Sequence, residues 1–156
     1  MRRQRHLHEN GYGFYHVYSR VTGTAKGYYP FEARDERARL EAELDLMILF
    51  YGVHVGFIAY MGNHFHLVLE VLRLTDAEVR MRWEIHDAEA IVTGRKPLPD
   101  WSQPGVLEAA RQEICSLSNF MRDLKGRFAQ KFNLRHERRG PFWADRYGCT
   151  VLDAAA

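Results

Sequence analysis

The chain has 156 residues, 46% of them hydrophobic, which is enough apolar material for one core and predicts a single domain over residues 1–156. Its longest apolar runs, residues 46–51 and 53–61, are too short to cross a bilayer and exclude a membrane-spanning helix. A net charge of +2 indicates no partner by itself, and two cysteines without a secretory signal predict a cytoplasmic protein rather than a disulfide framework.

Residues 12–21 alternate between two sets of side chains, which predicts a first strand. The two faces of this strand are Phe14, His16, Tyr18 and Arg20, and Tyr15, Val17, Ser19 and Val21. Residues 31–50 repeat apolar side chains every three or four positions, which predicts an amphipathic helix closed by Gly52. Residues 53–60 and 64–72 are predicted to be two strands joined by a tight turn.

A second helix is predicted to begin after Thr75 and to run to about residue 90. Thr75 is the expected N-cap, and Glu78 stands three residues later, as in a capping box. Glycines and prolines then mark residues 93–105 as a loop excursion on the surface.

Apolar residues from Val106 to Asn133 recur at spacings of three and four, which predicts one long helix. Gly140 and Pro141 break the chain, and residues 146–152 form a short predicted last strand. This order of elements fits an α+β ferredoxin-like sandwich, in which helices cover one face of an antiparallel sheet. We expect both hairpin strands to be central and the other face of the sheet to be open to a ligand.

Two histidines, His64 and His66, flank one apolar residue at the start of a predicted strand. Side chains two residues apart on a strand point to the same side, so the two imidazoles could hold one metal ion. Apolar residues at positions 65, 67, 68, 69 and 71 indicate that the strand is buried and holds the pair rigidly. The alternative is that both are ordinary histidines at a strand end.

The basic residues gather near the C-terminal end. Residues 111–146 carry nine Lys or Arg against four Asp or Glu, whereas residues 21–110 carry nine against fourteen. Aromatic residues are interleaved with these cations, as in surfaces that contact phosphates and stack on bases. A solvated helix face would show the same charge pattern, so this alternative stays open.

Four blocks of sequence resemble the single-tyrosine HUH transposases, and among them the REP-associated tyrosine transposases. The blocks are YHVYSR at 15–20 followed by Phe31, AYMGNHFHL at 59–67, FMRDLK at 120–125 and GPFWADRY at 140–147. They occur in the family's order and extend over most of the chain.

The resemblance implies cutting and rejoining of single-stranded or hairpin DNA, as in DNA transposition, with the HUH motif on a central strand. His64 and His66 would hold Mg²⁺ or Mn²⁺ against the scissile phosphate, where the metal acts as a Lewis acid. A tyrosine on the long C-terminal helix would attack phosphorus and form a covalent intermediate. Gln130 and Asn133 are the candidates for a third metal ligand. Monomer and homodimer both occur among such proteins, so a homodimer is possible here.

The chain departs from the family pattern at the nucleophile, because the expected tyrosine position holds Phe128, which has no hydroxyl. Three explanations compete. The residue was changed from Tyr to Phe to trap an uncleaved complex; the protein binds DNA without cutting, or cuts with another nucleophile such as Tyr147; or Phe128 is simply a core residue. Tyr147 is the alternative catalytic candidate, although a tyrosine in a strand more often packs or stacks.

We expect the DNA contacts to come mostly from basic side chains of the last third of the chain. The predicted phosphate contacts are Arg122, Lys125, Arg127, Lys131, Arg138, Arg139 and Arg146, with Phe142, Trp143 or Tyr147 as stacking candidates.

Two other functions fit parts of the pattern. A hairpin DNA-binding protein without catalysis needs the basic helix but neither metal nor nucleophile. A metal-dependent hydrolase unrelated to DNA would need a carboxylate to activate water, and Glu70 has the same strand parity as the histidines. This last function leaves the basic helix unexplained.

Overall fold

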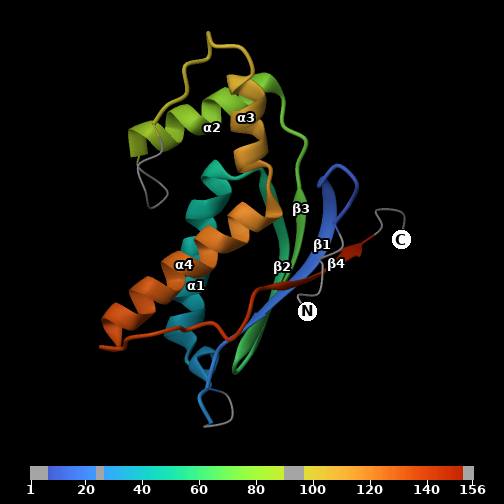
Figure 1. Cartoon of the computed structure of the whole chain (residues 1–156). Helices are drawn as coiled ribbons and strands as arrows, with labels where there is room; N and C mark the ends of the chain where they lie inside the picture. The colour runs from blue at the N-terminus through green and yellow to red at the C-terminus, as the bar shows by residue number, and fades with distance from the viewer. Residues whose placement is uncertain (1–6, 24–26, 90–96, 153–156) are drawn as a thin grey trace.

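The computed structural model describes residues 7–23, 27–89 and 97–152. Within these residues the chain forms four strands and four α-helices, with one 3₁₀ turn (Figure 1). They are β1 (Gly13–Arg20), η2 (Pro30–Glu32), α1 (Arg34–Phe50), β2 (Val53–Met61), β3 (His64–Val71), α2 (Asp76–Glu89), α3 (Val106–Ile114), α4 (Leu117–Arg135) and β4 (Gly148–Leu152).

The strand order in the sheet is β2-β3-β1-β4, and every neighbouring pair is antiparallel. Because β3 lies between β1 and β2, the β1–α1–β2 unit is split in the manner of ferredoxin-like folds, which confirms the predicted class. The prediction that both hairpin strands are central was wrong for β2, which lies at one edge. Strand β3, with the two histidines, is central.

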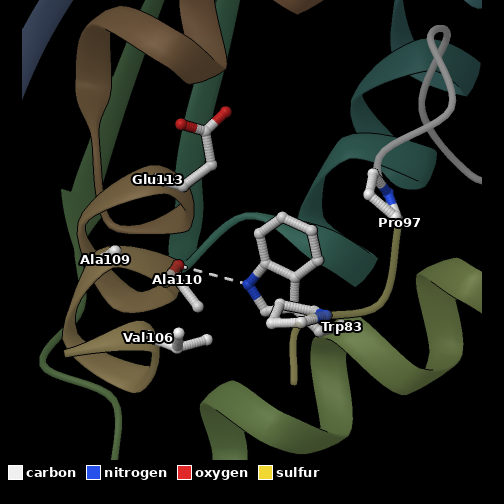
Figure 2. A pocket seen from close by; sticks show the side chains of 7 residues that line it. Trp83, Pro97, Val106, Ala109, Ala110 and Glu113 are labelled. Atoms are coloured by element: carbon white, nitrogen blue, oxygen red, sulfur yellow. Dashed lines mark hydrogen bonds between the residues drawn. The ribbon is translucent and has the colours of Figure 1, made fainter. Parts of the chain in front are cut away.

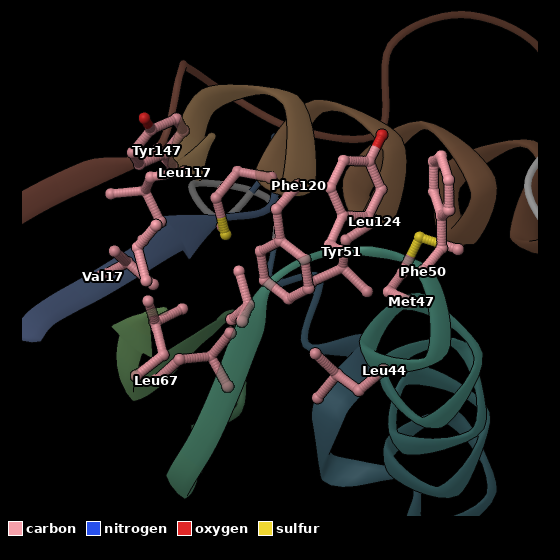
Figure 3. Packing of buried hydrophobic residues seen from close by; sticks show 14 of the residues in the cluster. Val17, Leu44, Met47, Phe50, Tyr51, Leu67, Leu117, Phe120, Leu124 and Tyr147 are labelled. Carbon is pink, nitrogen blue, oxygen red and sulfur yellow. The ribbon is translucent and has the colours of Figure 1, made fainter. Parts of the chain in front are cut away.

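The two faces of the sheet differ in what covers them. Alternate residues of β1 and β3, among them Tyr15, Val17, Phe65 and Leu67, are buried under the helices. Figure 3 shows part of this packing between the sheet and helices α1 and α4. The described helices lie on one side of the sheet (Figure 1), so the residues of opposite parity lie on a face that none of these helices covers. The predicted parity of the first strand is confirmed.

The predicted long helix over residues 106–133 was wrong, because α3 ends at Ile114 and α4 begins at Leu117. Ser116 caps the second helix, since its side chain accepts a hydrogen bond from the Asn119 amide at 3.2 Å. The Asn119 side chain in turn donates to the carbonyl oxygen of Glu113 at 3.0 Å. The apolar stripe continues across the break at a spacing of three, so periodicity alone did not reveal it.

The capping box of α2 is confirmed. The Glu78 amide donates to Thr75 Oγ1 at 3.2 Å, and the Thr75 amide donates to Glu78 Oε2 at 3.3 Å. Residues 97–105 of the predicted loop contain turns and no helix or strand, while residues 93–96 lie outside the described part of the chain. Among the described residues, no helix combines the length and apolar character needed to cross a bilayer.

Candidate functional site

His64 and His66 begin strand β3, directly after the two-residue turn that follows β2. In the pairing with β1, His64 lies opposite Arg20 and His66 lies opposite Tyr18. The two imidazole centroids are 4.9 Å apart on the face of the sheet that carries no helix. The spacing along a rigid, central strand therefore brings the two rings together, as the sequence predicted.

These two rings line a pocket of about 550 Å³. The pocket lies where β1 and β3 meet the segment that leads into β4. Its lining consists of His16, Tyr18, Ser19, Arg20, His64, His66, Asp145, Arg146 and Gly148. Imidazoles and arginines thus face one cavity, and these are groups that bind metal ions and phosphates.

The hydrogen bond of His64 determines which of its ring nitrogens is free. His64 Nδ1 lies 2.6 Å from Oδ1 of Asn63, an oxygen that can only accept. Nδ1 of the neutral ring therefore carries the proton, and Nε2 carries the lone pair. A lone pair on Nε2 is what a metal ligand requires.

His66 is also engaged at Nδ1, which lies 2.8 Å from Nε2 of His16, and either nitrogen can be the donor. Burial lowers the pKa of His66, and the neighbouring His64 and His16 lower it further. The ring is therefore kept neutral near pH 7, and a neutral imidazole is the form that binds metal.

The donor set fits a metal ion that is shared with a phosphate. Among the residues that the structure describes, no group of three or more His, Cys, Asp or Glu side chains is arranged to hold a metal. His64 and His66 would supply two nitrogens and leave most of an octahedral shell open. Mg²⁺ and Mn²⁺ prefer oxygen, so water and phosphate oxygens suit the remaining positions.

His16 and Tyr18 lie in this pocket, although neither was predicted as a site residue. The Tyr18 side chain is 45% exposed, and its ring centroid is 6.0 Å from that of His66. The ring lies over Gly148, where an added Cβ would meet the far end of the Tyr18 side chain, so a side chain at position 148 would require the ring to move. The signal that could have revealed both residues is the strand parity that places them on one face with Arg20.

The nucleophile position of the family lies in the core. Phe128 is 1% exposed and packs among aromatic rings on the helix-covered side of the sheet. Its ring centroid is 5.7 Å from that of Phe31 and 5.5 Å from that of Phe142. Phe128 is not part of the pocket lining, so it neither offers a hydroxyl nor faces the histidines.

Tyr147, the alternative nucleophile, is also buried. It is 6% exposed and lies beside Leu117 in the core cluster (Figure 3). Its hydroxyl is within hydrogen-bond distance, 2.9 Å, of the Ser118 hydroxyl on α4. This placement favours a packing role, which is the more frequent role of a tyrosine beside a strand.

The two amides predicted as a third metal ligand do not line the histidine pocket. Gln130 is exposed on α4, and Asn133 donates from Nδ2 to the carbonyl oxygen of Gly140 at 3.0 Å. Glu70, proposed as a water activator, has the parity of the histidines but lies four residues beyond His66. At 3.3 Å per residue, that separation along the strand is about 13 Å.

Several basic side chains that were predicted to contact DNA form contacts within the protein instead. Arg127 is buried and donates from Nε to Glu43 Oε2 of α1 at 2.7 Å. Lys131 bonds the other carboxylate oxygen of Glu43. Burial alone would raise the pKa of Glu43, but hydrogen bonds from Lys131 and Arg127 outweigh burial and lower it. These two cations join α4 to α1.

Lys125, Trp143 and Arg138 hold the segment between α4 and β4. Lys125 Nζ donates to the Asp145 carbonyl oxygen at 2.8 Å and lies 5.3 Å from the centre of the Trp143 ring. Trp143 donates from Nε1 to the Lys125 carbonyl oxygen at 2.9 Å. The Arg138 guanidinium lies 5.1 Å from the centre of the Tyr28 ring.

Three of the arginines predicted to contact DNA are exposed, and one of them, Arg146, lines the histidine pocket together with Arg20. Arg146 is exposed at the rim of the pocket, and Arg20 forms a surface ion pair with Asp145 at 3.4 Å. Surface pairs of this kind contribute little, so Arg20 can turn toward a phosphate. Arg122 and Arg139 are exposed at the two ends of the α4 region.

A second pocket, of about 450 Å³, lies between α2 and α3 (Figure 2). Trp83 points into it and donates from Nε1 to the Ala110 carbonyl oxygen at 3.2 Å. Prolines, alanines and a valine make up most of the lining, with Glu113 as its charged residue. This apolar lining suits neither a metal ion nor a phosphate, so the histidine pocket is the candidate functional site.

No protein-family model matches this chain, and a search of curated proteins finds no match.

Proposed function

We propose that the protein binds single-stranded or hairpin DNA on the helix-free face of its sheet, with a divalent metal ion on His64 and His66 beside a backbone phosphate. One observation carries the proposal: two imidazoles, each with Nδ1 engaged inside the protein, face one pocket with Arg20 and Arg146. The free Nε2 atoms can hold the ion. The arginines can hold a phosphate next to it.

When bound, Mg²⁺ or Mn²⁺ supplies Lewis acidity to the phosphate that it contacts. The chain's own residues do the rest. His64 and His66 orient the ion, Arg146 and Arg20 offset the charge of the backbone, and Tyr18 offers an exposed ring on which a base can stack.

Strand cleavage and transfer through a phosphotyrosine is the reaction that the sequence resemblance implies for this site. That reaction needs a hydroxyl nucleophile, and the expected position holds the buried Phe128. The absence of this hydroxyl favours the second candidate function, in which the protein binds DNA but no residue of α4 cleaves it. A tyrosine at this position would also have to leave the core, which the exchange of α4 in a homodimer would allow.

The experiment is a titration of a fluorescent DNA hairpin with the whole chain, with and without Mn²⁺. We expect Mn²⁺ to raise the affinity of the wild-type protein and to have no effect on His64→Ala. His54→Ala is the matched control, because His54 is an exposed histidine outside the pocket. If Mn²⁺ raises the affinity of wild type and His64→Ala equally, the proposed site is wrong.

A further inference from the structure

We propose that His16 is a positioning residue for His66, which accepts the Nδ1 proton of His66 and so keeps the Nε2 lone pair of His66 available to a metal ion. The inference rests on the proposed metal site and extends it to a residue of another strand.

The contact between the two rings has the geometry of a hydrogen bond. His16 Nε2 and His66 Nδ1 are 2.8 Å apart, and the planes of the rings differ by 15°. Rings stacked face to face would stand roughly 3.5 Å apart, so nitrogens at 2.8 Å require the rings to meet edge to edge. In this arrangement the proton of one nitrogen points at the lone pair of the other.

The sheet register creates this contact. His66 pairs with Tyr18 across β1 and β3, and His16 pairs with Val68, so His16 and His66 are diagonal neighbours on one face. Diagonal neighbours on paired strands are within reach of long and aromatic side chains.

One proton lies between the two nitrogens, and its position decides whether His66 can bind metal. If His66 donates, its Nδ1 carries the proton and its Nε2 has a lone pair. If His16 donates, the neutral His66 carries its proton on Nε2 and cannot be a ligand there. Histidine ligands commonly donate their other N–H to a partner that sets the tautomer.

His16 acts on His66 and not on the metal. Its Nε2 already bonds His66, and the described residues contain no three-ligand group. Asn63 has the equivalent position at His64, where Oδ1 accepts from Nδ1 at 2.6 Å. Each histidine therefore has its own acceptor, Asn63 from the turn and His16 from β1.

The first test needs no metal. Nitrogen-15 NMR of the histidine rings in the metal-free wild-type protein, at a pH where they are neutral, should show His66 protonated on Nδ1. In His16→Phe, which keeps a ring but removes the acceptor, the His66 proton should move to Nε2. A wild-type His66 protonated on Nε2 would overturn the inference, whatever the stability of the variants.

The second test is the Mn²⁺ affinity of the whole chain, measured from the relaxation of water protons. We expect His16→Phe to weaken Mn²⁺ binding about 10- to 100-fold. His16→Gln should recover most of the affinity, because its Oε1 can accept the same proton. His54→Phe, on a histidine outside the pocket, should leave the affinity unchanged.

The outcomes separate this inference from the proposed function. If His64→Ala abolishes Mn²⁺ binding while His16→Phe binds as wild type, only the positioning role is wrong. The positioning role is also wrong if His16→Gln binds Mn²⁺ as weakly as His16→Phe does. If wild type and His64→Ala give the same Mn²⁺ titration, the metal site itself is wrong.

Discussion

Arg127 of α4 and Glu43 of α1 form an ion pair in the interior, with Nε and Oε2 2.7 Å apart and side chains that are only 9% and 6% exposed. Arg127 lies within the segment whose basic residues predict a DNA-binding surface. The guanidinium bonds the neighbouring helix instead of facing solvent, so the DNA surface has to be built from the arginines that stay exposed.

Replacing Arg127 by Met should destabilise the fold by about 3–5 kcal/mol, because the carboxylate of Glu43 loses its buried partner. Urea unfolding measures the loss. The matched variant is Arg139→Met, on an exposed arginine of the same region, which should change stability by no more than about 0.5 kcal/mol. Equal stability of the two variants would show that the ion pair does not hold α1 to α4.

The lowered pKa of Glu43 predicts a loss of stability in acid. Since the folded-state pKa lies below the usual value of 4.5, the ionised carboxylate stabilises the fold above that pH. This contribution is lost as the pH falls from 4.5 through the folded pKa. Melting temperatures from pH 7 to pH 3 should fall less steeply for Glu43→Gln than for wild type below pH 4.5, although the variant is less stable at pH 7.

Arg146, exposed at the rim of the histidine pocket, should contact a DNA phosphate. Arg146→Gln is expected to weaken hairpin binding and to reduce the slope of log affinity against log salt by about 1, because one fewer counterion is released. Arg80→Gln is the control, since Arg80 is exposed on α2, away from the pocket. If the slope of log affinity against log salt is unchanged in Arg146→Gln but reduced in Arg80→Gln, the DNA does not bind at the histidine pocket.

Restoring a tyrosine tests the nucleophile position. With α4 exchanged in a homodimer, so that position 128 leaves the core, Phe128→Tyr should give Mn²⁺-dependent nicking of a single strand that bears a hairpin, together with a covalent protein–DNA adduct on a denaturing gel. It should also cost about 1–3 kcal/mol of stability, because the new hydroxyl enters an aromatic cluster.

The control for this experiment is Phe128→Tyr combined with Tyr147→Phe, which should keep the nicking activity because Tyr147 bonds Ser118 inside the core. Absence of nicking in folded Phe128→Tyr would count against position 128. An adduct of the wild-type chain that disappears in Tyr18→Phe would instead identify the tyrosine in the pocket as the nucleophile.

Much of the scaffold was predictable from local pattern. The parity of residues 14–21, the hairpin before His64 and the capping box of α2 are all confirmed. Each depends on side-chain spacing or on hydrogen bonds between residues close in the chain, which the sequence displays directly. The break between α3 and α4 was missed because a capping serine can sit inside an uninterrupted apolar stripe.

The composition of the site was only partly predictable. The spacing of His64 and His66 placed them on one face, but the bond between His16 and His66 joins residues 50 positions apart in the chain. The basic residues of α4 bond partners that are even farther away along the chain, since Arg127 and Glu43 are separated by 84 positions. No periodicity within one segment reveals such pairs.

By itself, the order of residues determined which side chains share a strand face, where the hairpin turns and that two imidazoles stand side by side. These properties follow from backbone geometry over a few residues. The tertiary structure alone decided which nitrogens of those imidazoles have partners within the protein, which arginines reach solvent and that Phe128 is enclosed by aromatic rings. Those properties depend on contacts between distant segments, which exist only once the sheet and helices have packed together.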